Sequence, residues 1–229
     1  MKETARVKMS HTQAKKILLT IEGNIGSGKS TMIKHLRELY PTFRIIDEPV
    51  DQWTNMCTED GKSLLELFYE DKMRWSYTFQ NCAFITRFIS ATKALAEDVS
   101  EDTIYISERG ILTDRHVFAT MLHDSGCLSK IEWELYSTWF AHFQSSCKPM
   151  GIIFITTDAS ICSDRIKMRN RQGESGIPQA YLDELDVYHE RWLSNSDIPV
   201  LRVSSDKDKV HDIATFANGF LSSHSVNGI

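Results

Sequence analysis

The sequence lacks several features that would define other classes of protein. Its five cysteines stand 15 to 45 residues apart, with no Cys-x-x-Cys pair and no Cys/His ligand spacing, which excludes the usual zinc motifs and favours a reducing compartment. Only 5 prolines and 11 glycines occur among 229 residues, which excludes a collagen-like or low-complexity chain. The longest stretch without a charged side chain, residues 213–229, is 17 residues long and rich in Ser, Asn, Gly and His. We therefore expect no segment that spans a membrane.

Positive charge is also scarce. Lys plus Arg number 26 against 31 Asp plus Glu, a formal net charge of −5, so we expect neither nucleic acid nor a membrane surface as a partner. Bound phosphates would need a local cluster of cations.

The length suits one domain. We expect a flexible basic leader over residues 1–16, a single domain over 17–222, a flexible tail over 223–229, and a cytoplasmic location with mitochondria or the nucleus left open.

Short apolar runs alternate with longer helical patterns along the chain. Several runs are continuously apolar, as in parallel strands that are covered on both faces. The runs cover residues 17–21, 43–46, 103–106, 152–155 and 200–203. The helical patterns cover residues 29–39, 62–97 in one or two pieces, 111–124, 129–146, 158–170, 179–194 and 207–221. This order predicts an α/β fold with a five-stranded parallel sheet flanked by helices on both faces, and ligands beyond the carboxyl ends of its strands.

A phosphate-binding motif follows the first apolar run. Residues 23–30 fit the pattern GxxxxGK[ST] between a buried strand and an amphipathic helix. Its glycines would let backbone N–H groups surround phosphate oxygens, Lys29 would reach the outer phosphates, and the Ser30 hydroxyl would bind Mg²⁺. The predicted ATP-binding residues of this P-loop are Gly23, Asn24, Ile25, Gly26, Ser27, Gly28, Lys29, Ser30 and Thr31.

Charged residues follow the other strands. Glu48 comes just after residues 43–46 and is placed to take the proton of an acceptor hydroxyl. Glu108 and Arg109 follow residues 103–106; Glu108 would hold the metal through water, and Arg109 would pair with Glu48 or the substrate. Four cations lie within residues 165–171, after the fourth strand, and a loop over 172–176 follows. We interpret residues 165–176 as an Arg-rich lid that brings cations onto a polyphosphate.

Together these motifs resemble the deoxyribonucleoside kinase family, which includes deoxycytidine, deoxyguanosine and mitochondrial thymidine kinases. The resemblance covers about residues 17–203. The motifs that carry it are the P-loop at 23–30, Glu48-Pro49-Val50-Asp51-Gln52-Trp53, Tyr69, Arg74-Trp75-Ser76-Tyr77-Thr78-Phe79-Gln80, Glu108-Arg109, Asp114-Arg115 and the lid with Gly176-Ile177-Pro178.

The resemblance implies a P-loop kinase fold and a role for each matching residue. Glu48 would take the proton of the sugar 5′-hydroxyl, and Arg109 would hold Glu48 and that end of the substrate. Tyr69 and Glu174 would bind the 3′-hydroxyl. The base would meet Gln80 at its edge and the aromatic walls Phe79, Phe118 and Trp53. The ATP phosphates would meet Arg165, Arg169 and Arg171. Family members are commonly homodimers, so we expect a homodimer.

Specificity depends on Arg87 and Asp114, which match an Arg/Asp pair of the deoxycytidine and deoxyguanosine kinases. Such a pair accepts from an exocyclic amine and crowds a 5-methyl group. The resemblance therefore favours deoxycytidine and purine deoxynucleosides over thymidine. Two positions depart from the family: Gly110 replaces a common serine, and Gly173-Glu174 replaces paired acids, which leaves only Glu174 for the sugar.

Two alternatives remain open at this point. A nucleoside monophosphate kinase, such as a thymidylate kinase, shares the P-loop, an Asp-Arg pair and an Arg-rich lid. Its acceptor is already charged, so it has no need of a carboxylate base such as Glu48. A regulatory GTPase or a nucleic-acid ATPase is disfavoured because no Asn-Lys-x-Asp motif occurs and the net charge is negative.

Overall fold

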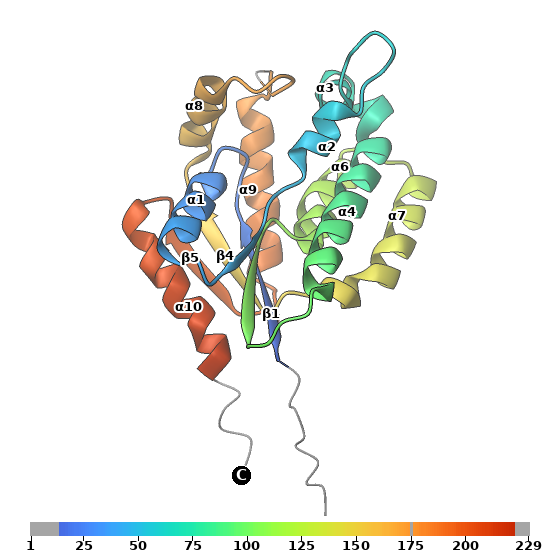
Figure 1. Ribbon diagram of the computed structural model, residues 1–229. Helices are drawn as coiled ribbons and strands as arrows, with labels where there is room; N and C mark the ends of the chain where they lie inside the picture. The colour runs from blue at the N-terminus through green and yellow to red at the C-terminus, as the bar shows by residue number, and fades with distance from the viewer. Residues whose placement is uncertain (1–13, 175, 223–229) are drawn as a thin grey trace, which may run out of the picture.

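The computed structural model describes residues 14–174 and 176–222, and a parallel sheet forms its centre (Figure 1). Five strands hydrogen-bond in the order β2-β3-β1-β4-β5, and every neighbouring pair is parallel. The strands are β1 (Lys16–Glu22), β2 (Arg44–Ile46), β3 (Thr103–Glu108), β4 (Gly151–Thr156) and β5 (Val200–Ser204). The predicted five-stranded parallel sheet is confirmed.

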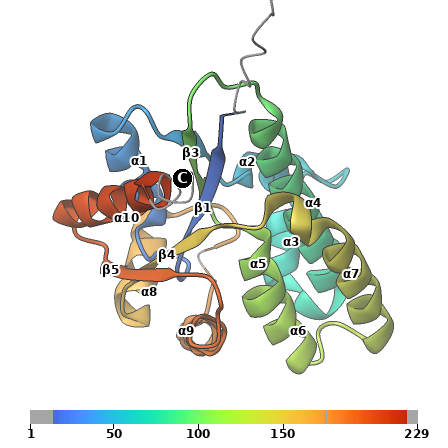
Figure 2. The same cartoon turned by 90° about the horizontal axis from the view of Figure 1, so that it is seen from below.

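One face of the sheet is covered by α1 (Lys29–Leu39) and α10 (Val210–Ser222). Side chains alternate between the faces of a strand, so Ile17, Leu19 and Ile21 of β1 pack against these two helices. Leu18 belongs to the aromatic core on the opposite face. Viewed from below, α1 and α10 lie on one side of the strands, and α4 to α7 lie on the other (Figure 2). The predicted two-sided helical cover is confirmed.

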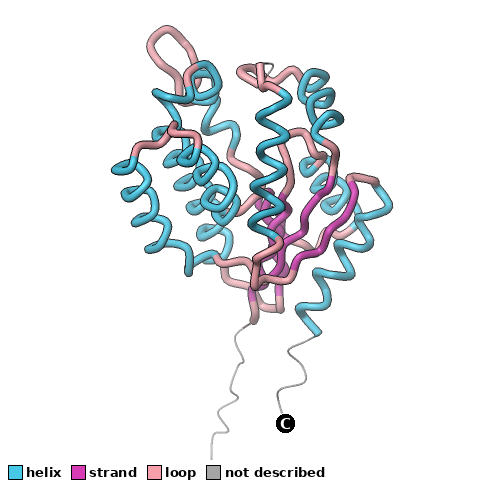
Figure 3. The backbone as a smooth tube through the Cα atoms, turned by 180° about the vertical axis from the view of Figure 1, so that it is seen from behind, coloured by secondary structure: helices cyan, strands magenta, loops and turns pink. Residues whose placement is uncertain are grey.

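The opposite face carries a larger helical layer. It is built from α2 (Val50–Asn55), α3 (Leu64–Glu70), α4 (Lys72–Ala96), α5 (Ile111–Thr113), η1 (Asp114–Ala119), α6 (Thr120–Asp124), α7 (Lys130–Phe143) and η2 (Gln144–Cys147). Seen from behind, α9 (Gln179–Leu193) crosses in front of the strands (Figure 3), where Leu193 packs on Ile152 and Phe154. The remaining helices are α8 (Ala159–Arg169) and η3 (Lys207–Lys209).

Helix ends follow local side-chain chemistry. Ser63 and Ser129 each form a capping box, in which the serine hydroxyl accepts from the N3 amide and the N3 glutamate accepts in return. The predicted helical stretch 62–97 divides at Asp71, which ends α3 and caps α4 through its side chain. The short helix α2 was not predicted. Its six residues are too few for a hydrophobic period to show.

The expectations for a basic leader and a C-terminal tail fall largely outside the described residues, which omit 1–13 and 223–229. Within the described chain, β1 already begins at Lys16, the last residue assigned to the leader. None of the helices in residues 14–174 and 176–222 combines the length and the apolar character that crossing a membrane requires.

Candidate active site

A cavity of about 610 Å³ lies where the P-loop, β2, β3 and the helical layer meet. Every candidate site residue predicted outside the P-loop lines it. In the P-loop, Gly23, Asn24 and Ser27 do not reach the cavity, whereas the other predicted residues do. The cavity wall also includes four residues that were not predicted to belong to the site: Asp47, Val50, Asp51 and Leu65.

The P-loop adopts a backbone that only glycine tolerates at two tight points. Gly26 has φ +78°, and a Cβ there would lie 2.5 Å from the carbonyl oxygen of Cys162. Gly28 has φ +102° and directly precedes α1. A side chain at either position would push the loop away from its neighbours. The loop therefore presents its amides at the N-terminus of α1, which favours anions.

Lys29 lies at the centre of this loop. Its buried ammonium donates to the carbonyl oxygens of Gly23 at 3.2 Å and Asn24 at 2.7 Å. Burial, reinforced by the charge of Arg109, lowers the pKa of Lys29 to about 7 against the opposing pull of nearby glutamates. An anion in the cavity would raise that pKa and favour the charged ammonium.

Ser30 and Glu108 meet directly. The Ser30 hydroxyl donates to Glu108 Oε1 at 2.6 Å, although the two residues are 78 positions apart. Burial raises the pKa of Glu108, and the charge of Glu48 adds to the effect. A hydroxyl and a carboxylate are the hard oxygen donors that suit Mg²⁺, so the two predicted metal residues lie together and fit that ion.

The Asn24 side chain binds α9 and does not line the cavity. Its side-chain nitrogen donates to the Leu182 carbonyl at 2.8 Å and to Asp186 at 2.6 Å, both on α9. Its side-chain oxygen accepts from the Ile25 amide. These contacts fix the P-loop to α9. Within the P-loop, the backbone carbonyl of Asn24 accepts a hydrogen bond from Lys29.

Glu48 follows β2 and forms the hub of the charged cluster. Its Oε1 accepts from Arg87 Nη2 at 2.5 Å and pairs with Arg109 Nε at 3.2 Å. Burial alone would raise the pKa of Glu48, but Arg87, Arg109 and Lys29 outweigh it and lower the pKa to about 2. Glu48 is therefore a fixed anion whose pairing with Arg109 agrees with the sequence prediction.

Arg87 has a second contact that the sequence did not reveal. It bridges Glu48 and the buried Asp114, to which its other nitrogen donates. Burial raises the pKa of Asp114, while the guanidinium of Arg87 opposes that rise. Sequence analysis placed the Arg87–Asp114 pair at the base edge only. The structure adds that Arg87 touches the predicted catalytic carboxylate.

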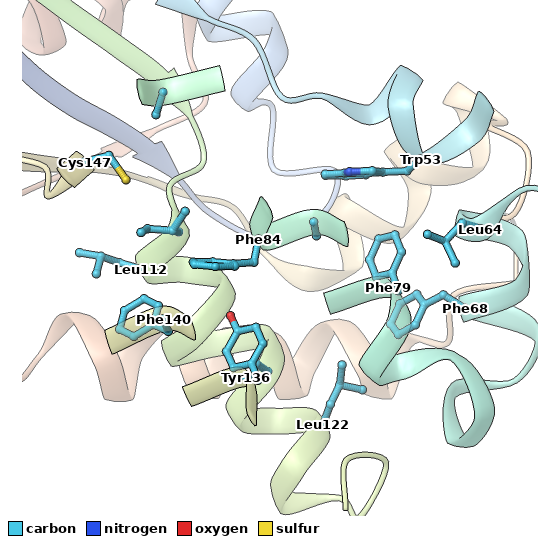
Figure 4. Close-up of a cluster of buried hydrophobic side chains, with 14 of the residues drawn as sticks. Trp53, Leu64, Phe68, Phe79, Phe84, Leu112, Leu122, Tyr136, Phe140 and Cys147 are labelled. Atoms are coloured by element: carbon cyan, nitrogen blue, oxygen red, sulfur yellow. The ribbon is translucent and has the colours of Figure 1, made fainter. Parts of the chain in front are cut away.

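Aromatic rings form another part of the cavity wall. Phe79 stacks on Phe68 with centroids 4.5 Å apart and meets the edge of Trp53 at 5.5 Å, as Figure 4 shows. Trp53 is anchored by its indole N–H, which donates to Thr86 at 2.9 Å. Gln80 on α4 also lines the cavity, and its buried Oε1 has no hydrogen-bond partner among the described residues.

Another part of the cavity wall comes from η1, a π-helical turn. It brings both Asp114 and Phe118 to the cavity, and the Phe118 ring lies 5.0 Å from the guanidinium carbon of Arg109. π-helical turns are rare and are frequent at functional sites. The helical pattern over 111–124 predicted an ordinary helix, because a single wider turn leaves no mark on a hydrophobic pattern.

The predicted lid contacts the P-loop at one end. Arg165 donates to the Ser27 carbonyl at 3.0 Å and to Ser205 Oγ, just beyond β5, at 3.1 Å. Further along, Arg169 and Arg171 bind the two oxygens of the buried Glu174 at 2.5 and 2.9 Å. Glu174, predicted to hold the sugar, thus lines the cavity while paired with two lid arginines.

Two further residues support the site and were missed. Glu22, the last residue of β1, is fully buried behind Arg109 and accepts from the Gly110 amide at 3.0 Å. A charged side chain ending an apolar strand directly before the P-loop is the signal that could have found it. Ser205 was missed because a single serine after a strand carries no signal of its own.

The parallel sheet, the glycine loop after β1 and the cluster of carboxylates and cations define a P-loop phosphotransferase. Comparison with known proteins narrows this class. The family model for deoxynucleoside kinases matches residues 19–221. The chain is 33% identical over 242 residues to the deoxycytidine kinase of Homo sapiens, covering 92% of each chain.

Two further relatives agree. The chain is 37% identical over 202 residues to the probable deoxycytidine kinase of Fowlpox virus, covering 85% of this chain and 81% of that one. It is 32% identical over 216 residues to the mitochondrial deoxyguanosine kinase of Xenopus laevis, covering 83% and 82%. The chain therefore belongs to the deoxynucleoside kinase family. The predicted kinase function is confirmed, and a nucleoside monophosphate kinase is not favoured.

Proposed function

We propose that this kinase transfers the γ-phosphoryl group of ATP to the 5′-hydroxyl of deoxycytidine or a purine deoxynucleoside, in preference to thymidine. The observation that carries the proposal is Glu48, a buried carboxylate held by Arg87 and Arg109 in the same cavity as the P-loop lysine. A neutral hydroxyl acceptor needs such a carboxylate, whereas an acceptor that already carries a phosphate would be repelled by it.

Glu48 orients the 5′-hydroxyl and receives its proton. With a pKa of about 2, it is ionised at neutral pH but is a weak base. Phosphoryl transfer passes through a loose transition state, in which the attacking oxygen becomes acidic only as its bond to phosphorus forms. The proton therefore moves late, and the main contribution of Glu48 is to align the hydroxyl with the phosphorus atom.

Lys29 and the P-loop amides hold the donor phosphates. The Ser30 hydroxyl and Glu108, which lie 2.6 Å apart, would hold Mg²⁺, and the ion would neutralise phosphate charge. Arg165 is tied to the P-loop through Ser27. The lid arginines Arg169 and Arg171 reach the phosphates when they release Glu174, and Glu174 then becomes free to accept from the sugar 3′-hydroxyl, as does Tyr69.

Base recognition rests on the aromatic wall and the amide of Gln80. A planar slot between Phe79 and Phe118 stacks any base, and Gln80 offers a donor and an acceptor side by side. The unpartnered, buried Oε1 of Gln80 supports a hydrogen bond to the base edge. The anionic Asp114 beside Arg87 favours a base with an exocyclic amine, which excludes thymine.

The oligomer and the location belong to the same proposal. Apolar side chains stand exposed along neighbouring helices: Ile85 and Ile89 on α4, and Ile131, Leu135 and Trp139 on α7. Such a two-helix face supports a homodimer, because apolar patches of this kind mark protein interfaces.

We further propose that the enzyme acts in the cytoplasm, as its free cysteines agree with a reducing compartment.

A panel of acceptors with labelled ATP and Mg²⁺ tests this proposal. The panel holds the four natural deoxynucleosides and deoxycytidine monophosphate, each measured as kcat/KM. The proposal predicts the highest values for deoxycytidine and the purine deoxynucleosides, a lower value for thymidine and no transfer to the monophosphate. A preference for thymidine would overturn the specificity, and efficient phosphorylation of the monophosphate would overturn the proposed acceptor.

A further inference from the structure

Arg109 has an unusual backbone. Its φ is +60°, one of only two positive values among the non-glycine residues described. The left-handed region is unfavourable for a side chain with a Cβ atom, by about 1–2 kcal/mol. Such a conformation persists only where the surroundings hold it, and it clusters at functional sites. The second such residue, Asn170, ends α8, where a left-handed residue is ordinary.

Three hydrogen bonds hold this turn. The Arg109 amide donates to the Ile21 carbonyl at 3.0 Å, and the Arg109 carbonyl accepts from the Ser107 hydroxyl at 2.8 Å. The next amide, that of Gly110, donates to Glu22 Oε1 at 3.0 Å. Both polar backbone groups of Arg109 and the amide that follows are thus bound by neighbours, and two of the three partners are side chains.

Apart from this hydrogen bond, Glu22 is energetically unfavourable at this buried position. It is fully buried, and its second oxygen has no hydrogen-bond partner in the described part of the chain. Burial raises its pKa to about 6, although Thr113, Arg109 and Thr20 oppose that rise. A buried carboxylate reduces stability unless it is compensated, so the fold alone gives no reason for an acid here.

The turn is also pressed against β1. A Cβ at Gly110 would lie 2.8 Å from Thr20 Cγ2 and 3.5 Å from Glu22 Oε1. The backbone after Arg109 therefore cannot drift toward the strand, and its bond to Glu22 keeps it from drifting away. Small backbone rotations at Arg109 would swing its guanidinium out of reach of Glu48, from which its Nε is 3.2 Å away.

We propose that Glu22 is a positioning residue for phosphoryl transfer, which with Ser107 fixes the left-handed backbone of Arg109 and so holds the guanidinium against Glu48. The inference rests on the proposed role of Arg109 beside Glu48. Glu22 itself touches neither nucleoside nor nucleotide. Its effect on the reaction passes through the Gly110 amide and the Arg109 backbone.

The test measures kcat and KM for the full-length E22A, E22Q and S107A variants. Loss of the bond in E22A lowers kcat by about tenfold or more, because small misplacements of site groups slow a reaction this strongly. The KM for ATP changes by less than about twofold. E22Q rescues most of the rate, because glutamine still offers an oxygen to the Gly110 amide. The control is S76A, since the buried Ser76 hydroxyl has no hydrogen-bond partner among the described residues.

A double-mutant cycle separates positioning from general damage. In the R109A background, E22A and S107A should lower the residual kcat no further, since the group they position is gone. A wild-type kcat in E22A, or an equal loss of kcat in both backgrounds, would overturn the proposal. If E22A does not fold, S107A and R109A give the same cycle. Failure of the proposed catalytic role of Glu48 is a distinct result, because E48Q would then keep its rate whatever the cycle shows.

Discussion

At the scale of single residues, the site is a balance of buried charges. Lys29, Arg87 and Arg109 surround Glu48 and lower its pKa to about 2. Glu108 and Asp114 have raised pKa values because burial dominates there, although Arg87 binds Asp114 directly. The surroundings therefore lower the pKa of Glu48 and raise the pKa values of the other two carboxylates. Of these three carboxylates, Glu48 is the one that two arginines hold, and its surroundings keep it ionised.

Arg87 and Asp114 should separate rate from specificity. R87M removes a cation that holds Glu48, so we expect kcat to fall for every nucleoside. D114N keeps the shape of the pocket but removes the anion, so we expect the kcat/KM of thymidine relative to deoxycytidine to rise about tenfold, the range that pocket contacts supply. Steady-state kinetics with both nucleosides measures the two effects.

Breaking this buried pair also reduces stability, by about 3–5 kcal/mol for loss of one partner. The assays must therefore be run well below the melting temperature of each variant. An unchanged thymidine-to-deoxycytidine ratio in D114N would remove Asp114 as a specificity residue. A change of that ratio in R87M with kcat preserved would remove the link from Arg87 to Glu48.

Glu22 should give the free energy of unfolding a specific pH dependence. Its pKa in the folded protein is about 6 against an ordinary value of 4.5, so the folded state holds a proton that the unfolded chain has released between these values. This stabilisation is complete below pH 4.5 and is lost as pH rises through 6. E22Q lacks it, so its stability relative to the natural chain should rise by about 2 kcal/mol from pH 4.5 to 7.

Urea unfolding of both proteins across this pH range measures that difference. The other buried acids contribute equally to both proteins and cancel. A difference that does not vary with pH would mean that Glu22 has the same pKa in the folded and unfolded states, and the buried carboxylate would need another account.

Most site residues could be predicted from sequence because they follow strand ends. Glu48, Glu108 and Arg109 each come directly after an apolar run, and the topology of a parallel sheet brings such positions to one edge. The bridge from Arg87 to Glu48 could not be predicted, because the partners lie 39 residues apart on elements whose distance only the packing decides.

At the scale of elements, the lid lies against the helix that carries Tyr69. Gly173 has φ +85° and approaches the backbone of Glu66 in the first turn of α3. Gln172 donates to Glu66 Oε1 at 2.8 Å, and Glu66 is the capping-box residue of α3. The lid thus contacts both the P-loop, through Arg165, and the acceptor side of the cavity.

Gly173→Ala should weaken the docking of the lid on α3. A Cβ at this position would lie 2.9 Å from Glu66 Cγ and 3.1 Å from Glu66 Cα, so the lid must shift or adopt a strained backbone. We expect a higher KM for ATP or a lower kcat, with a melting temperature near that of the natural chain because both segments lie at the surface.

Gly176→Ala is the matched control, since a Cβ there would meet nothing within 4 Å among the described residues. Equal kinetics for the two variants would show that the contact with Glu66 does not affect the lid during turnover.

Element boundaries show where sequence patterns are insufficient. The five strands were predicted from short apolar runs, and the longer helices from their helical patterns. The π-helical turn η1 and the six-residue α2 were not, because a wide turn and a single short turn leave no period to read. Both carry residues of the cavity, Asp114 and Phe118 on η1 and Trp53 on α2.

At the scale of the whole molecule, net charge and local charge differ. The chain carries a formal −5, yet the cavity gathers Lys29, Arg87 and Arg109 with three arginines of the lid. We propose that this cluster binds the phosphates, since the sequence predicts that phosphate binding would need a local group of cations. A nucleotide reaches it by local rather than long-range attraction.

The exposed faces of α4 and α7, which lie side by side on one flank (Figure 1), should form the dimer interface. Charges placed there by I89D together with L135D are expected to convert a dimer at micromolar concentration into a monomer, because an interface core excludes charged groups. Light scattering measures the mass. The control M168D alters a side chain that is 77% exposed on α8, outside this face.

A natural chain that is monomeric at micromolar concentration would refute the dimer. Equal dissociation by M168D would show that the loss comes from charge in general and not from this face.

The central claim, that Glu48 is the base that aligns the 5′-hydroxyl, is tested most directly by the kcat of E48Q with deoxycytidine and saturating ATP. Glutamine keeps the size of the side chain and removes its charge. The account predicts a fall in kcat of about 10²–10⁴, the usual contribution of a general base, with little change in the KM for deoxycytidine. A kcat near that of the natural enzyme would contradict it.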